Sequence, residues 1–236
     1  GIGAGPMVNF ALEEIAARLN AKTLKNVVAV PTGTLTANEA AFAGVPVASL
    51  KDVVSVNVTI LQADEVVTYG APSPGIACIV GRGQRPVQPD LLMIRAVINK
   101  SAKVVLLAER VSDKPLGGIV PIAIIAGPEW EEVGEELDDM FLGDAEVWRR
   151  GVAPGANPRG GAQPYTSPDG DHTIVDLKFE DPMTNGRWEA GMLMFGEPAT
   201  PYQIAEALVG IEGVLGHGIV TQADAVFVPN LDDEEE

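Results

Sequence analysis

The chain has 236 residues, 46% of them hydrophobic, and its 33 acidic and 16 basic residues give a formal net charge of −17. A chain of this length and hydrophobic content buries a sizeable core, which excludes an intrinsically disordered protein. The negative charge repels nucleic acid and anionic membrane surfaces, so the expected partner is a protein with a basic surface. No apolar run reaches the roughly 18 to 20 residues that span a bilayer.

The first residues form a glycine-rich segment that runs into a predicted helix. Gly1, Gly3 and Gly5 precede apolar residues at helical spacing over residues 8–19. A glycine loop before a helix N-terminus is a potential phosphate site. The dinucleotide-binding fingerprint is missing, because Pro6 stands where its third glycine would be. A plain turn that starts a helix is the alternative interpretation of this segment.

The next segments indicate alternating helices and strands. Residues 36–43 predict a short helix that ends at Gly44, a common C-terminal cap. Residues 57–61 are β-branched and apolar, which predicts a parallel strand, and the polar residues 62–65 follow at its carboxyl end. In open α/β sheets, ligands bind at that edge. We expect a loop to follow, ending at Gly81-Arg82-Gly83.

The second half of the chain predicts a smaller α+β domain. Residues 120–125 read as a strand, and Pro128 suits the first turn of a helix whose apolar residues Val133, Leu137 and Phe141 share one side. The remainder of that helix is strongly acidic. Such a charge run is usually a solvated face, although it would also suit a basic partner.

Four motifs resemble those of ribose-5-phosphate isomerase A, especially its plant-type members. They are Val30-Pro31-Thr32, Ala63-Asp64-Glu65-Val66, Gly81-Arg82-Gly83, and Glu212-Gly213-Val214 with Gly216-His217-Gly218. The resemblance covers nearly the whole chain. It implies an α/β fold with a Rossmann-like, mainly parallel sheet domain and a second, smaller α+β domain of the ferredoxin-like type. His217 is expected to be a structural residue and not a base.

The resemblance also implies which positions of the isomerase site are kept and which are replaced. The residues that match are Thr32, Asp64, Glu65, Gly81 and Gly83. Hydroxyl residues of the glycine loop are replaced by Ala4, Pro6 and Met7, an aspartate by Leu61, the following glycine by Gln62, a lysine by Val80 and the glutamate base by Ile94. A shift of register would leave Asp90 as the acid nearest that last position. Because a phosphate loop needs hydroxyl and N–H donors, we expect weak phosphate binding and no catalysis.

The predicted domains follow from this pattern. Residues 1–120 with 216–230 form the isomerase-type domain, which is expected to be N-terminally incomplete because Gly1 stands within a motif. Residues 121–215 form the small domain, and residues 231–236 form an acidic tail.

Two regions rich in glycine, proline or polar residues are the expected interaction surfaces, together with the acidic helix and tail. They are residues 151–170 and an insertion at residues 185–197. Loops longer than about 12 to 15 residues tend to be functional or disordered, although a tolerated surface insertion is the alternative here. Arg149, Arg150 and Arg159 would form a basic patch on the first of these regions.

The function predicted from the sequence is that of a non-catalytic protein with the isomerase fold. It would act as a structural subunit of a larger protein assembly, in a plastid as the plant-type resemblance implies. The alternative is a divergent sugar-phosphate isomerase, or a related enzyme, with an altered substrate. No cofactor or metal is predicted, since no cluster of Cys and His is present, and the single Cys78 is expected to be buried. A homodimer is also compatible with the sequence.

Overall fold

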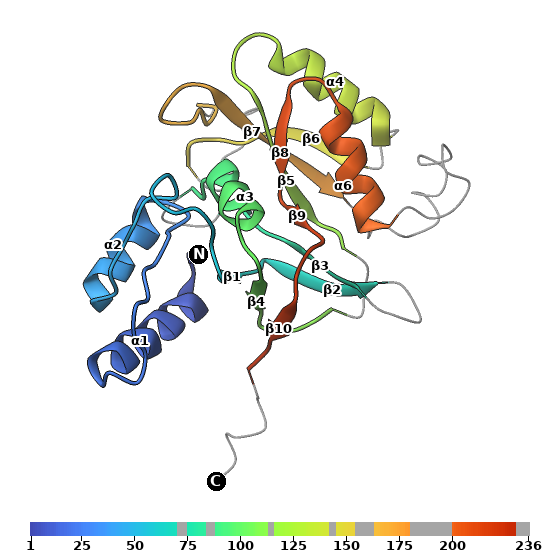
Figure 1. Ribbon diagram of the computed structural model, residues 1–236. Coiled ribbons are helices and arrows are strands. Elements are labelled where there is room, and N and C mark those ends of the chain that lie inside the picture. The colour runs from blue at the N-terminus through green and yellow to red at the C-terminus, as the bar shows by residue number, and fades with distance from the viewer. Residues whose placement is uncertain are drawn as a thin grey trace. The chain divides into compact units, whose positions relative to one another are not determined.

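The computed structural model describes residues 1–69, 75–83, 88–112, 116–141, 145–153, 163–179 and 200–229 (Figure 1). Two compact units make up the chain. The first contains Gly1–Asp64, Met93–Val111 and Gln222–Glu236, and the second contains Glu65–Leu92 and Ser112–Thr221. The predicted acidic tail, the insertion at residues 185–197 and residues 154–162 of the predicted loop lie outside the described residues.

The first unit is built on a parallel sheet. Strands β1 (Thr59–Gln62) and β10 (Ala225–Phe227) both pair in parallel with β4 (Val104–Leu107). Parallel bridges join Ile2 to both Ile60 and Pro31, and Ala29 to Val47. Six parallel segments make up this sheet, which in chain order are those at Ile2, at residues 29–31 and at Val47, followed by β1, β4 and β10. When they are numbered 1 to 6 along the chain, their order across the sheet is 3-2-1-4-5-6, which is the doubly wound order. The winding reverses between the segment at Ile2 and β1.

Helices of the first unit pack on this sheet through regularly spaced apolar residues. Helix α1 (Pro6–Asn20) begins with proline, whose fixed backbone angle suits the first turn, and it buries Val8 and Leu12 together with Ile2 of the sheet. Helix α2 (Thr34–Ala43) ends as predicted at Gly44, whose φ of 84° lies in the left-handed region. Helix α3 (Leu91–Asn99) buries Val97 against Val30 and Val56 in this unit.

A four-stranded antiparallel sheet with two helices dominates the second unit. The elements follow the chain as β5 (Ile119–Ile125), α4 (Trp130–Phe141), β6 (Ala145–Arg149), β7 (His172–Phe179), α6 (Pro201–Gly210) and β8 (Val214–His217). Their spatial order is β6-β7-β5-β8, and every neighbouring pair is antiparallel. This is the split βαβ arrangement of ferredoxin-like domains.

The core of this unit lies between the sheet and its two helices. Leu137 and Phe141 of α4 pack with Leu208 of α6 and with Ile122 and Leu177 of the sheet. All five side chains are at most 2% exposed. Helix α4 buries residues four positions apart, which is the spacing that the sequence indicated.

A second antiparallel sheet corrects the loop expected after Glu65. Strands β2 (Glu65–Tyr69) and β3 (Gly75–Ile79) form a hairpin, and β3 also pairs with β9 (Ile219–Val220). Alternate residues such as Val67, Ala77 and Ile79 enter the core of the second unit, which is why this segment is a hairpin and not a loop. Cys78 on β3 is fully buried, as predicted.

The predicted fold class is confirmed: one unit has a Rossmann-like, mainly parallel sheet, and the other is an α+β unit of the ferredoxin-like type. The two units nevertheless divide the chain differently from the predicted domains, because residues 65–92, 112–120 and 216–221 belong to the second unit. Within the described residues, no helix is both long enough and apolar enough to cross a membrane.

Candidate functional site

The glycine segment of the first unit is held tightly against β1. The amide of Gly3 donates to the carbonyl of Ile60, and the amide of Ile60 donates to the carbonyl of Gly1, at 2.9 and 3.0 Å. A Cβ added to Gly3 would lie 2.7 Å from Cδ2 of Leu61. A side chain at residue 3 would therefore displace Leu61, which is 2% exposed and fills the space beside Gly3.

The side chain of Gln62 reaches the start of α1. Its Oε1 atom accepts a hydrogen bond from the backbone amide of Met7 at 3.0 Å. A Cβ added to Gly5, whose φ is 131°, would collide with the same carboxamide. The polar end of Gln62 therefore lies across the first turn of α1, where helical amides have no partner within the helix.

The carboxyl ends of three neighbouring strand segments bring several predicted residues to one edge of the first unit. The glycine segment leads into Ala4, Pro6 and Met7, the segment before Pro31 leads into Thr32, and β1 leads into Asp64. Thr32 is 4% exposed, and its amide donates to the carbonyl of Ile2 at 3.0 Å. Ile94, the residue predicted to replace the glutamate base, is on α3 and is 8% exposed.

Glu65 and the Gly81-Arg82-Gly83 turn come together in the second unit. The Nη2 atom of Arg82 lies 2.7 Å from Oε2 of Glu65, and Oε1 of Glu65 accepts from the amide of Gly117 at 3.1 Å. Arg82 also donates to the carbonyls of Gly117 and Ile119, each at 2.7 Å. Both carboxylate oxygens of Glu65 are thus engaged in holding the turn.

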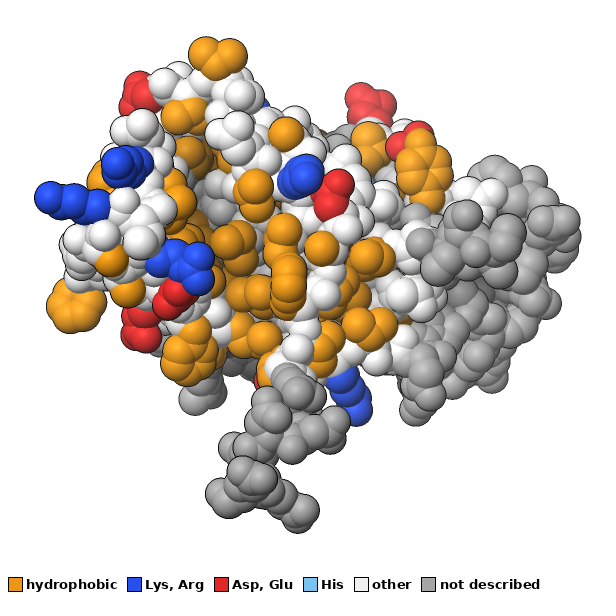
Figure 2. Space-filling view, turned by 60° about the horizontal axis from the view of Figure 1, so that its bottom comes forward, with side chains coloured by type: hydrophobic (Ala, Val, Ile, Leu, Met, Phe, Trp, Pro, Cys, Tyr) orange, Lys and Arg blue, Asp and Glu red, His pale blue; other side chains and the backbone are white. Residues whose placement is uncertain are grey.

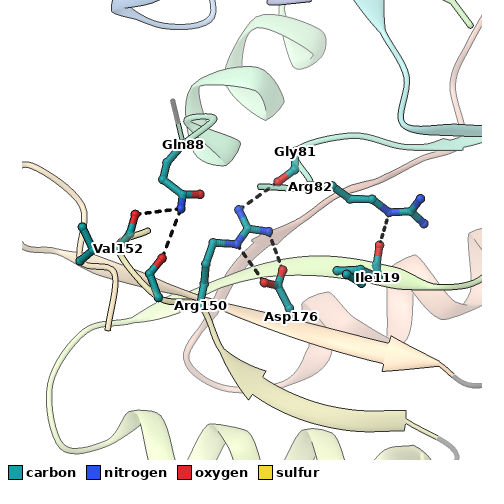
Figure 3. A network of polar contacts seen from close by, with 8 residues as sticks. Gly81, Arg82, Gln88, Ile119, Arg150, Val152 and Asp176 are labelled. Atoms are coloured by element: carbon teal, nitrogen blue, oxygen red, sulfur yellow. Dashed lines mark hydrogen bonds and ion pairs between the residues drawn. The ribbon is translucent and has the colours of Figure 1, made fainter. Parts of the chain in front are cut away.

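A second arginine, Arg150, anchors the same turn from the position directly after β6, and it pairs with Asp176 on β7. The Nη1 atom of Arg150 donates to the carbonyl of Gly81 at 3.0 Å, and its other nitrogens donate to the carboxylate of Asp176 (Figure 3). Gln88 donates to the carbonyls of Gly151 and Val152 beside it, both at 3.2 Å. Figure 3 shows the guanidinium of Arg150 between Gly81 and Asp176.

The expected basic patch of three arginines is wrong for Arg150, which is 5% exposed and paired with Asp176. The guanidinium of Arg149 lies 4.8 Å from the ring centroid of Trp130, a cation–π contact within its own unit. Arg159 lies outside the described residues. Sequence reasoning missed this outcome because nothing in the local pattern links residue 150 to residue 176.

The backbone around Val80 and Gly81 is closely packed. Val80 is 2% exposed, and a Cβ at Gly81, whose φ is 86°, would lie 2.9 Å from Cδ1 of Leu91. His217 on β8 is 1% exposed and faces Ile122 in the neighbouring strand. This burial agrees with its predicted structural role.

Asp90, the alternative acid near Ile94 in the sequence, influences a tyrosine of the second unit. Burial raises the pKa of Tyr165 above its ordinary value of 10.0, and the carboxylates of Asp90 and Asp169 raise it further, whereas Arg150 lowers it. In the part of the chain that the structure describes, no three His, Cys, Asp or Glu side chains gather in a way that could hold a metal ion.

The parallel sheet and the ferredoxin-like unit define an α/β protein of the Rossmann-like type. The family model of ribose 5-phosphate isomerase A (phosphoriboisomerase A) matches residues 28–233, and the chain belongs to this family. No curated protein sequence matches it.

Solved ribose 5-phosphate isomerases share the fold. The Plasmodium falciparum enzyme is 23% identical with a TM-score of 0.73, over 96% of this chain and 85% of that one. The Methanocaldococcus jannaschii isomerase A is 19% identical with a TM-score of 0.72, over 98% and 87%. A D-ribose-5-phosphate isomerase in complex with phospho-erythronic acid is 24% identical with a TM-score of 0.72, over 96% and 85%.

These findings contradict the prediction that the chain is not an enzyme. The family is one of isomerases, and the solved structures that it resembles are ribose 5-phosphate isomerases, which are enzymes. The prediction judged replaced side chains such as Val80 and Ile94 one position at a time. It gave too little weight to the retained framework, in which the glycine loop, Thr32 and Asp64 follow three adjacent parallel strands.

Proposed function

We propose that this chain is a divergent aldose–ketose isomerase that binds a sugar phosphate or a related polyhydroxy substrate at the carboxyl edge of its parallel sheet. The observation that carries the proposal is the reversal of strand order between the glycine segment and β1. Ligands of doubly wound sheets bind at such reversals, outside the carboxyl ends of the strands. Here that edge presents the start of α1, Thr32 and Asp64.

Asp64 is our candidate for the proton-transfer group. Interconversion of an aldose and a ketose removes a proton from one carbon and returns it to its neighbour, so it needs a base within reach of both. Asp64 lies two residues beyond the carboxyl end of β1. Thr32 follows the strand segment on the other side of the Ile2 segment, and its hydroxyl can donate or accept. The replaced side chains of the glycine loop support a substrate other than ribose 5-phosphate.

The test is exchange of the carbon-bound hydrogen next to the carbonyl. Purified protein is incubated in deuterated water with a panel of aldoses, ketoses and their phosphates, and incorporation is followed by NMR. We expect exchange with at least one compound and a loss of about 10²- to 10⁴-fold in Asp64→Asn. The matched control is Asp52→Asn, which changes an exposed aspartate of the same unit. Exchange with no compound, or exchange unaffected by Asp64→Asn, would overturn the proposal.

A second proposal is that the protein works within a larger protein assembly, with a plastid as its location. Several apolar side chains of the first unit are widely exposed, namely Phe10 at 71%, Phe42 at 96%, Val54 at 97% and Phe227 at 60%. Figure 2 shows hydrophobic side chains gathered at the centre of one face. Contiguous exposed apolar patches mark protein contacts, and the charge of −17 favours partners with basic surfaces.

Sedimentation of the native protein at cellular concentration tests this second proposal. We expect a species much larger than a dimer, and its partial dissociation when Phe42 and Val54 are both changed to Ser. The control Val209→Ser changes a residue of the second unit that is 58% exposed. A free monomer or simple homodimer would contradict the assembly, and fractionation of the native cells tests the plastid location.

A further inference from the structure

We infer that the carboxamide of Gln62 closes the glycine loop to phosphate, so that the loop meets an uncharged part of the substrate. The consequence for the substrate rests on the proposed isomerase function. The closure itself rests on the contacts of Gln62 with the first turn of α1.

The amides of the first turn of α1, at residues 6 to 9, are absent, engaged or buried. Pro6 at the first helical position has no N–H group, and the amide of Met7 donates to Oε1 of Gln62 at 3.0 Å. The amide of Asn9 donates to the carbonyl of Gly5 at 3.1 Å in the first helical bond. Val8, which lies between them, is fully buried. An anion site needs converging N–H groups, and while the carboxamide of Gln62 accepts from Met7 the first turn of α1 offers none.

The position of Gln62 relative to Gly5 makes the closure steric as well. The side chain runs so close to Gly5 that a Cβ there would collide with Oε1, Cδ and Cβ of Gln62. Because Gln62 is the last residue of β1, its backbone is fixed by pairing with Leu107 of β4. Phosphate could reach the amide of Met7 only after the carboxamide had rotated away and lost its hydrogen bond.

A glutamine suits this position because its oxygen is a neutral acceptor. The start of a helix favours negative charge or an acceptor, and the carboxamide oxygen supplies the acceptor without adding a charge. Residue 4 is alanine, so no hydroxyl from the loop competes for the same amide. Removal of the Gln62 side chain should therefore expose an amide that can donate to an anion.

Calorimetric titration with inorganic phosphate tests the inference. We expect no measurable binding to the wild-type protein at millimolar phosphate, and saturable binding in Gln62→Gly and Gln62→Ala with an affinity at least about tenfold above the limit set for the wild type. Gln62→Glu keeps an acceptor near Met7 and adds a negative charge, so it should stay closed. The matched control is Gln222→Ala in the same unit, which should behave as the wild type.

The amide resonance of Met7 gives a second readout that needs no variant. In the wild-type protein it should stay unchanged when phosphate is added. Either a saturable shift of this resonance in the wild type, or no gain of binding in both folded shortened variants, would overturn the inference. Phosphate binding is measured without turnover, so its result does not depend on the result of the deuterium-exchange experiment. The titration can refute the role of Gln62 while the exchange supports the isomerase function, and the exchange can refute the isomerase function while the titration supports the role of Gln62.

Discussion

Arg150 donates hydrogen bonds to both carboxylate oxygens of Asp176, from Nε to Oδ2 at 3.0 Å and from Nη2 to Oδ1 at 2.5 Å. The side chains are 4% and 14% exposed, so water screens this pair little. The third contact of the guanidinium, with the carbonyl of Gly81, ties the turn at Gly81 to β7 of the ferredoxin-like sheet.

Removing one partner of this pair should destabilise the protein strongly. In Asp176→Ala the buried guanidinium of Arg150 keeps its charge without its carboxylate, and we expect a loss of about 3 to 5 kcal/mol in the free energy of unfolding. Urea denaturation measures it. The double variant Arg150→Met with Asp176→Leu should recover much of the loss, since both charges are then absent. A single-variant loss below about 1 kcal/mol would show that the pair is not buried in solution.

Replacement of Arg82 by lysine should weaken the same turn, although by less. The planar guanidinium donates to Glu65, Gly117 and Ile119 at once, and an ammonium group cannot reproduce that geometry. Because the ion pair is about one-fifth exposed, with side chains at 22% and 21%, we expect a loss of only about 1 to 2 kcal/mol. The exposed Arg110 provides the control, since Arg110→Lys should change stability by less than about 0.5 kcal/mol. Equal effects of the two changes would contradict the role given to Arg82.

Gly81 and Gly210 should respond oppositely to a single added methyl group. Gly81 has a φ of 86°, and a Cβ there would press on Leu91, so Gly81→Ala should cost at least about 1 to 2 kcal/mol. Gly210 ends α6 with open space around its Cα, so Gly210→Ala should be neutral or stabilise by up to about 1 kcal/mol. Thermal and urea unfolding of both variants measure the difference, and similar losses at the two sites would refute it.

Tyr165 should titrate at a higher pH than an ordinary tyrosine. Burial is the main cause of its raised pKa, followed by Asp90. Since the neutral phenol is favoured in the folded state, its contribution to stability is present below pH 10 and is lost as the pH rises through the raised pKa. Phenolate absorbance, with Tyr165→Phe subtracted, gives the pKa directly. Asp90→Asn should move it downward, and a titration at or below 10 in the wild type would contradict the prediction.

The sequence by itself determined the elements whose signals are local. Helix α2 ends at Gly44 as predicted, and α4 buries Val133, Leu137 and Phe141 as their spacing indicated. The strand before Asp64 was recognised from its β-branched residues and its polar carboxyl end, although its bounds shifted by one or two positions. These features depend on the spacing of apolar residues over a few helical turns or along one strand, and that spacing can be read from residues close together in the sequence.

Only the tertiary structure decided the partners of the polar side chains. Gln62 and Met7 are 55 positions apart, and Arg150 and Asp176 are 26 apart. Their contacts depend on which strands pair and in what register, and no local pattern encodes that choice. The hairpin after Glu65 was missed for the same reason, because β3 becomes a strand through pairing with both β2 and the distant β9.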